Sequence, residues 1–178
     1  ARRLYGDEPF AVELAQTAYA FDATTIDLCL ALFPWAQFRR HKAAVKLHTL
    51  LDLRAQIPTF VAITHGKTAE VTLLDALLIE PGAFYVLDRG YTDFGRLYTL
   101  TQSLAFFVIR GKRGLDYARR LSRPVDRTTG LRSDQTIRLC GPKTRTLYPV
   151  PLRRIRYVDR ATGHRFVFLT NHFTLPPL

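Results

Sequence analysis

Hydrophobic and polar residues along the first 110 positions follow a pattern that predicts strands separated by two helices. Residues 16–22 predict a first strand, and residues 44–64 predict a hairpin of two further strands with a turn between them. Residues 69–79 change to helical spacing, with an apolar residue every three or four positions, and the Pro-Gly pair at 81–82 ends that helix.

The next segment has the order strand, helix, strand. Residues 83–88 are an apolar run that ends in Asp88, which predicts a buried strand. Residues 93–104 predict a helix, and Asp93 suits its N-cap because a carboxylate accepts a free backbone N–H. Residues 105–110 predict another buried strand. This order is typical of parallel β-α-β crossovers and favours an α/β fold.

From residue 111 onward the sequence predicts strands without long helices between them. Turn signals separate three segments that alternate in hydrophobicity or are apolar and aromatic, residues 133–140, 152–159 and 164–170. Residues 159–164 indicate a hairpin connection. The sequence therefore predicts three parts: an α/β core over residues 1–110, a β-rich basic insertion over residues 111–170, and a short connection over residues 171–178.

The formal net charge of +11 is concentrated in the second part of the chain. Residues 1–109 hold 10 Lys/Arg and 11 Asp/Glu, whereas residues 110–165 hold 16 Lys/Arg and 4 Asp/Glu, a net of +12. A basic segment of this density indicates a polyanionic partner, and arginine suits paired contacts to phosphate. The candidate nucleic-acid-binding residues are Arg89, Arg110, Lys112, Arg113, Arg153 and Arg154.

Aromatic residues lie among these arginines, and two interpretations of them stay open. They stack on exposed nucleobases, or they form the core of a small β subdomain, which we favour for most of them.

The composition also narrows the classes of protein to which the chain can belong. No run of 18 uncharged apolar residues indicates a membrane span, and the first residues lack a signal peptide, so we expect a cytoplasmic protein with no membrane partner. Cys29 and Cys140 are expected to be free, buried thiols, and the five histidines show no metal-type pairing with cysteine. The chain contains no Met and begins with Ala, which suggests an internal piece of a longer chain.

Two aspartates follow apolar runs that predict buried strands. Asp22 ends the run Ala18–Phe21 and Asp88 ends the run Ala83–Leu87. A carboxylate at the end of a strand is placed where α/β sheets bind ligands, so the pair predicts a divalent-metal site. The alternative is that each Asp is a turn residue or the N-cap of the following segment.

Two segments of the sequence resemble the first and second catalytic-aspartate regions of DDE transposases. They are Asp22-Ala23-Thr24-Thr25-Ile26-Asp27-Leu28 and Tyr85-Val86-Leu87-Asp88-Arg89-Gly90-Tyr91. The similarity is greatest to the bacterial insertion-sequence family four group, and it extends over essentially the whole chain.

The resemblance implies a ribonuclease-H-like mixed sheet with flanking helices and a β-rich insertion after the fifth strand. It implies an enzyme that cuts and joins transposon ends in DNA with Mg²⁺ or Mn²⁺, and it maps Asp22 and Asp88 onto the first two carboxylates of the triad. It also implies a bacterial, nucleoid-associated protein, with a homodimer among the expected forms of the full-length protein.

The sequence departs from the family pattern at the third carboxylate. That residue belongs on a helix after the insertion, and no Glu occurs after Glu80. We therefore expect the central piece of a transposase, one that binds metal weakly and has little or no catalytic activity by itself.

Two alternatives to a transposase piece stay open. The first is a non-catalytic nucleic-acid-binding protein that retains the basic face. The second is another ribonuclease-H-like nuclease, whose third acid would come from Asp27, Asp52 or Glu70.

Overall fold

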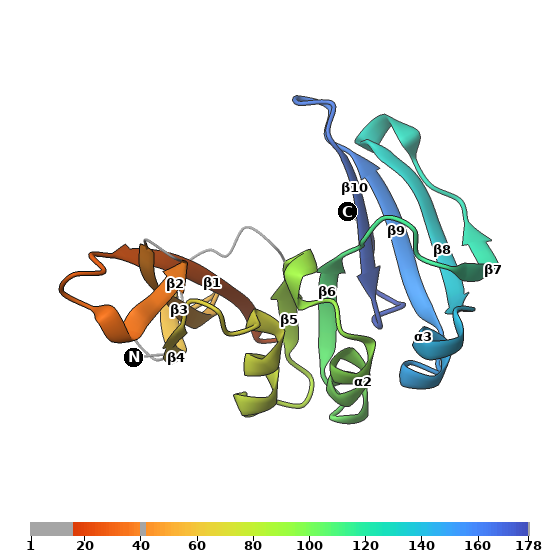
Figure 1. Ribbon diagram of the computed structural model, residues 1–178. Coiled ribbons are helices and arrows are strands. Elements are labelled where there is room, and N and C mark those ends of the chain that lie inside the picture. Colours follow the sequence, from red (N-terminus) through yellow and green to blue (C-terminus); the bar gives the residue numbers. More distant parts are fainter. Residues whose placement is uncertain (1–15, 40–41, 178) are drawn as a thin grey trace. The chain divides into compact units, whose positions relative to one another are not determined.

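The structure is a computed structural model that describes residues 16–39 and 42–177. By its internal contacts the chain divides into two compact units, residues 1–78 and residues 79–178 (Figure 1). We refer to them as unit 1 and unit 2 and describe each by itself. No helix in the described part of the chain is long and apolar enough to cross a membrane.

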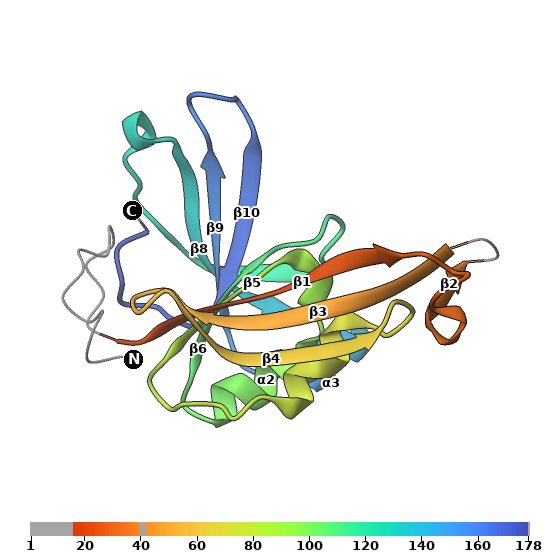
Figure 2. The same ribbon diagram turned by 90° about the vertical axis from the view of Figure 1, so that its left-hand side faces the viewer.

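Unit 1 is built on three long antiparallel strands, β1 (Ala18–Leu28), β3 (Lys42–Asp52) and β4 (Ile57–His65). Strand β3 lies in the middle and pairs with both β1 and β4 (Figure 2). The short strand β2 (Gln37–Arg39) pairs with the start of β3 and follows the 3-10 turn η1 (Pro34–Ala36). The hairpin expected over residues 44–64 is therefore confirmed as β3 and β4.

One face of the unit 1 sheet is buried around Phe21. Its ring lies 6.3 Å from the ring of Phe60 and 6.4 Å from that of His48, one from each of the other two long strands. Phe21 and His48 are fully buried. His48 Nε2 is 2.8 Å from Thr64 Oγ1, and His48 Nδ1 has no hydrogen-bond partner in the described structure. A histidine is thus part of the core of unit 1.

We expect unit 1 to be less stable in mild acid because of His48. Burial lowers the pKa of His48 below its ordinary value of 6.5. Two smaller contributions come from Glu70, which raises the pKa, and from Lys46, which lowers it. The unfolded chain then binds a proton more readily than the folded chain, so the free energy of unfolding falls as the pH drops below about 6.5. Urea denaturation at a series of pH values checks this, with His48→Gln expected to show a smaller pH dependence.

Two sequence predictions in unit 1 need correction. Strand β1 does not end at Asp22 but continues to Leu28, because Ala23–Leu28 pair without interruption with β3. The helix expected over residues 69–79 is a 3-10 segment, η2 (Glu70–Ala76). Its N-cap residue, Ala69, makes no side-chain capping bond, and the β-branched pair Val71-Thr72 disfavours an α-helix.

Unit 2 is a mixed sheet with the strand order β5-β6-β10-β9-β8-β7. The first pair is parallel and the remaining pairs are antiparallel. The strands are β5 (Phe84–Leu87), β6 (Phe106–Arg110), β7 (Tyr117–Arg123), β8 (Leu131–Leu139), β9 (Leu152–Val158) and β10 (Arg165–Thr170). The helical segments are η3 (Arg89–Tyr91), α2 (Phe94–Gln102), η4 (Arg127–Thr129) and α3 (Pro142–Leu147).

Helix α2 makes the crossover between the parallel strands β5 and β6, as the sequence predicts. Asp93 is its N-cap and accepts a hydrogen bond from the Arg96 backbone N–H at 3.1 Å, which confirms the predicted cap. Tyr148, which follows α3, is buried against the rings of Phe94, Tyr98 and Phe107. Helices α2 and α3 therefore cover one face of the sheet at one end of its long strands.

A buried ion pair holds the opposite face of the same sheet. Arg153 on β9 donates to both carboxylate oxygens of Asp134 on β8, at 2.9 and 2.7 Å, and also to the Leu175 carbonyl at 2.6 Å. Arg153 is 4% exposed and Asp134 is 2% exposed. Arg153, a candidate nucleic-acid-binding residue from the sequence, is therefore buried, and its guanidinium group is bound inside the fold.

The basic segment after residue 110 belongs to the same sheet as β5 and β6. Strand β10 pairs with β6, so residues 117–170 extend that sheet, and these residues all lie in unit 2. The division expected at residues 110 and 170 stays a prediction. The three strands expected in this segment are present as β8, β9 and β10. Strand β7 and helix α3 were not predicted, because β7 is mostly polar and α3 is only six residues long.

Candidate nucleic-acid interface

Asp88 stands at the carboxyl end of a buried strand, as predicted. In β5 the residues Phe84, Tyr85 and Leu87 are buried, which fixes the place at which the chain leaves the sheet. Asp88 itself is exposed. It occupies the N-cap position of η3 but makes no side-chain capping bond there. Helix capping therefore does not explain why a carboxylate stands at this position. The buried ring of Tyr91 anchors the short turn that follows.

Asp22 lies within β1, opposite Thr49 of β3. It is exposed, on the sheet face away from the buried Phe21. Asp22 belongs to unit 1 and Asp88 to unit 2. A metal site built from both carboxylates therefore remains a prediction.

The three other acids considered from the sequence have different surroundings in unit 1. Asp27 is five positions from Asp22 on the same strand, hence on the opposite sheet face and about 17 Å away along it. Asp52 is buried and its Oδ1 accepts the backbone N–H groups of Arg54 and Ala55, and Glu70 pairs with Lys46 at 3.0 Å. Among residues 16–39 and 42–177, no group of three or more His, Cys, Asp or Glu side chains could hold a metal ion.

Unit 2 contains a basic cavity of about 430 Å³, which we call the first arginine pocket. Six cationic residues line it, and none of the described residues that line it is acidic. Five of the six candidate nucleic-acid-binding residues come together here, and the sixth cation, Arg165, was not predicted. The cationic lining residues are Arg89, Arg110, Lys112, Arg113, Arg154 and Arg165.

A neighbouring ring holds one of these guanidinium groups in place. Arg154 Cζ lies 4.9 Å from the centre of the Tyr117 ring, and Arg154 also donates to Gln135 Oε1 at 3.3 Å. Arg110 is different: its Cζ lies 4.9 Å from the centre of the Phe166 ring, and Phe166 lines the apolar cavity on the other sheet face. Burial lowers the pKa of Arg154 below its ordinary value, although an arginine stays charged at neutral pH. Stacked guanidinium groups are already ordered before a ligand binds.

The loop after β6 brings two further cations to the pocket. Gly111 donates its N–H to the Val167 carbonyl at 2.7 Å, so the loop starts close against β10. A Cβ on residue 111 would lie 3.1 Å from Val167 Cγ1, tighter than ordinary contact. Gly114 then turns the chain with a φ of +74°. Lys112 and Arg113, between these two glycines, are exposed.

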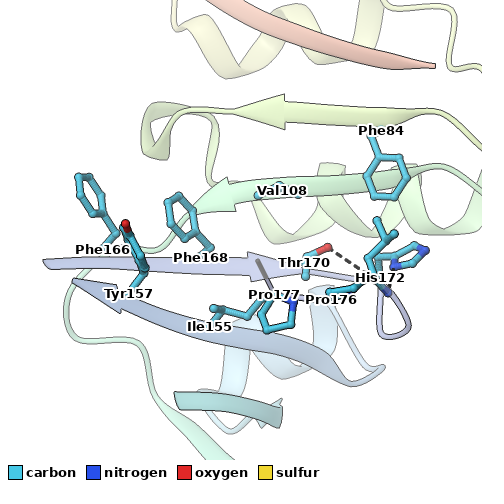
Figure 3. A pocket seen from close by; sticks show the side chains of 11 residues that line it. Phe84, Val108, Ile155, Tyr157, Phe166, Phe168, Thr170, His172, Pro176 and Pro177 are labelled. Atoms are coloured by element: carbon cyan, nitrogen blue, oxygen red, sulfur yellow. Dashed lines mark hydrogen bonds between the residues drawn. The ribbon is translucent and has the colours of Figure 1, made fainter. Parts of the chain in front are cut away.

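The other sheet face of unit 2 carries an apolar cavity of about 410 Å³ (Figure 3). Tyr157, Phe166 and Phe168 line one end of it, with the Phe166 and Phe168 rings stacked 5.9 Å apart. His172 and Pro177 line it further along. These aromatic residues are half-buried. They are therefore less buried than core residues and less exposed than rings that are free to stack on nucleobases, the two interpretations left open by the sequence.

The two cysteines differ from their prediction in one respect. Cys29 and Cys140 are free, as expected, but both are exposed instead of buried. Each follows the end of a strand, where the chain turns away from the sheet.

A family model described as the transposase DDE domain matches residues 13–177, nearly the whole chain. The chain belongs to this transposase family. The DDE transposase predicted from the two aspartate segments is thereby confirmed at the level of the family.

Two curated proteins resemble this transposase-family chain in sequence. "Putative transposase y4zB" of Sinorhizobium fredii (strain NBRC 101917 / NGR234) is 32% identical over 154 residues, which is 84% of this chain and 42% of that protein. "Probable transposase for insertion sequence element IS5377" of Geobacillus stearothermophilus is 25% identical over 160 residues, 85% of this chain and 40% of that protein. The chain thus spans less than half the length of either relative.

A solved structure of the piggyBac transposase, in a synaptic complex with hairpin DNA, resembles this chain in fold. The TM-score is 0.51 at 9% sequence identity, over 89% of this chain and 34% of that one. The likeness bears on the fold alone, and it confirms the predicted ribonuclease-H-like α/β class for the transposase-family chain.

Proposed function

We propose that this chain is the central part of a DNA transposase that cuts and joins transposon ends. In this proposal Asp22 and Asp88 are the first two metal-binding carboxylates, and the first arginine pocket binds the DNA backbone beside Asp88. One observation carries the proposal: six cationic residues and no acidic residue line one cavity, and Arg89, which directly follows Asp88, is one of the six.

The two aspartates have the chemistry that a magnesium or manganese site needs. Both carboxylates are exposed, and oxygen donors of this kind are the ligands that Mg²⁺ prefers. A divalent ion bound there would supply charge neutralisation for phosphodiester cleavage and activate the attacking hydroxyl group. Two carboxylates offset less charge than three, so we expect the site in these 178 residues to bind metal weakly.

The protein's own contribution is to hold the phosphate backbone at the end of β5. Arginine presents several donors in one plane and can contact two oxygens of one phosphate. Arg154 is fixed by its contact with the Tyr117 ring, whereas Lys112 and Arg113 lie on an exposed loop. A strand bound by these groups would pass close to Arg89 and therefore to the neighbouring carboxylate of Asp88.

We expect DNA binding by the 178-residue chain to depend strongly on salt, and to weaken when the loop cations are removed. Log affinity falls as log salt rises, and each phosphate contact makes this slope steeper by about 0.9 for a duplex. The double variant Lys112→Ala/Arg113→Ala should therefore reduce the magnitude of the slope by about 1.8. Fluorescence anisotropy with a labelled duplex over a range of salt concentrations measures it.

A matched control removes the same charge elsewhere in unit 2. Arg138 and Arg145 are both exposed, and neither lines the first arginine pocket. Arg138→Ala/Arg145→Ala should leave the slope nearly unchanged. Equal losses from both double variants would mean that only the net charge matters, which would contradict a defined DNA site in the pocket.

The second candidate function is DNA binding without catalysis. It is favoured by the first arginine pocket, since six cations line it and neither Asp22 nor Asp88 does. The two functions differ in the role of the aspartates: a purely DNA-binding protein would take up no divalent metal through Asp22 and Asp88. Metal binding measured on Asp22→Asn and Asp88→Asn separates them.

A further inference from the structure

A second basic cavity, of about 510 Å³, lies at the far end of the β9–β10 hairpin. We call it the second arginine pocket. Four arginines line it, together with Gly163 of the hairpin turn and with residues of β9 and β10. Arg165 and Val167 line both arginine pockets, so the two cavities adjoin. The four lining arginines are Arg127, Arg132, Arg156 and Arg165.

The register of the strands explains why these charges share one sheet face. Arg156 of β9 is opposite Val167 of β10, and Arg154 is opposite Leu169. Residues two apart on a strand point to the same face about 7 Å from one another, so Arg154 and Arg156 form a row from one pocket to the next. The buried Leu169 is on this face. The basic row thus continues beyond the helix-covered end of the sheet.

A close approach of two backbones brings η4 and the start of β8 to the second pocket. Gly130 has a φ of +99°, and a Cβ on it would lie 2.5 Å from the Val158 carbonyl oxygen. The Val158 N–H donates to the Gly130 carbonyl at 2.9 Å. Asp126 caps η4 by accepting the Thr128 N–H at 2.8 Å. Arg127 is in this fixed turn, and Arg132 follows two residues after Gly130.

The four arginines carry positive charge that the fold itself does not neutralise. Among the described residues, no Asp or Glu lies within salt-bridge distance of Arg127, Arg132 or Arg156, and none lies within that distance of Arg165. By contrast, Arg153 on the opposite face is fully paired with Asp134. Unpaired arginines gathered around a cavity repel one another, and an anionic ligand relieves that repulsion.

We propose that the second arginine pocket is a second binding site for the DNA backbone, continuous with the first through Arg165. One nucleic-acid strand would then run along β9 and β10 from the Asp88 end of the sheet to the hairpin turn. This inference rests on the proposed function, because it assumes that the first pocket binds DNA. It adds a site that the sequence analysis did not contain, since Arg127, Arg132, Arg156 and Arg165 were not among its candidates.

The test compares salt dependence for variants of the two pockets in the complete 178-residue chain. Arg132 and Arg156 are exposed, so replacing them should change stability little. Arg132→Ala/Arg156→Ala should reduce the magnitude of the slope of log affinity against log salt by about 1.8 for a long duplex. When these two changes are combined with Lys112→Ala/Arg113→Ala, the reduction in the magnitude of the slope should approach about 3.6 if the sites are independent.

The outcomes separate this proposal from the one on which it rests. A slope lowered only by the first-pocket variant overturns the second site and leaves the first intact. A slope lowered by neither variant overturns both proposals. A slope lowered equally by Arg138→Ala/Arg145→Ala overturns the second site as well, because the effect would then reflect net charge. Unfolding curves of each variant confirm that the compared proteins are folded.

Discussion

Replacing Asp134 by Ala is expected to lower the free energy of unfolding of unit 2 by about 3–5 kcal/mol. The change leaves the guanidinium group of Arg153 buried at 4% exposure without its carboxylate partner. A second arginine, Arg123, lies 3.4 Å from the same carboxylate and would lose its partner too. Breaking a buried pair from one side costs more than the pair contributes, because an uncompensated charge remains inside the protein. Urea denaturation of both proteins measures the difference.

Two further variants show whether the buried charge is the cause. Asp116→Ala removes an exposed carboxylate from the same unit and should change stability by less than about 0.5 kcal/mol. Replacing both partners, as in Asp134→Leu/Arg153→Met, should recover much of the loss, since apolar residues of similar volume often substitute for a buried ion pair. A small effect of Asp134→Ala, or no recovery in the double variant, would contradict this account of the Arg153 environment.

Asp88→Asn is expected to abolish DNA strand cleavage while leaving DNA binding in place. The assay needs a longer polypeptide that contains these residues and cleaves transposon-end DNA. Metal-ion catalysis is worth several kcal/mol, so loss of a metal-binding carboxylate should slow cleavage by at least about a hundredfold. DNA affinity without metal should stay equal or rise, because the substitution removes a negative charge beside the first arginine pocket.

Asp116→Asn serves as the control for the cleavage assay, because it removes the same charge from an exposed position outside the arginine pockets. Cleavage by this variant should match that of the unchanged protein. Full cleavage by Asp88→Asn would rule out the proposed role of Asp88. Loss of DNA binding together with cleavage would indicate that Asp88 acts on the fold or on the pocket.

The parts of the fold that the sequence predicts well are those whose signals are local. The run Ala83–Leu87 is apolar throughout, contains β5 (Phe84–Leu87) and is buried except at Val86. Asp93 is followed by residues of helical spacing and caps α2 with its own side chain. In both cases the interactions that decide the structure come from residues a few positions apart. The same reason explains the successful prediction of the β3–β4 hairpin.

The parts that it predicts poorly depend on distant residues. Arg153 and Arg154 are neighbours in one strand and look alike in the sequence, yet they point to opposite faces. Arg153 is buried because Asp134, 19 positions earlier, comes to lie beside it. Arg165 joins the first arginine pocket because β10 pairs with both β6 and β9. Side-chain alternation shows that two neighbours differ in direction, but only strand pairing determines which one meets solvent.

The most direct test of the central claim is to map the metal site with Fe²⁺ in place of Mg²⁺. Bound Fe²⁺ with ascorbate and peroxide cuts the polypeptide backbone close to the ion, and the positions of the cuts identify its neighbours. The account predicts cuts near both Asp22 and Asp88, with both sets lost when either residue is changed to Asn. Cuts near only one of the two aspartates, or cuts that persist in both variants, would contradict a metal site shared by Asp22 and Asp88.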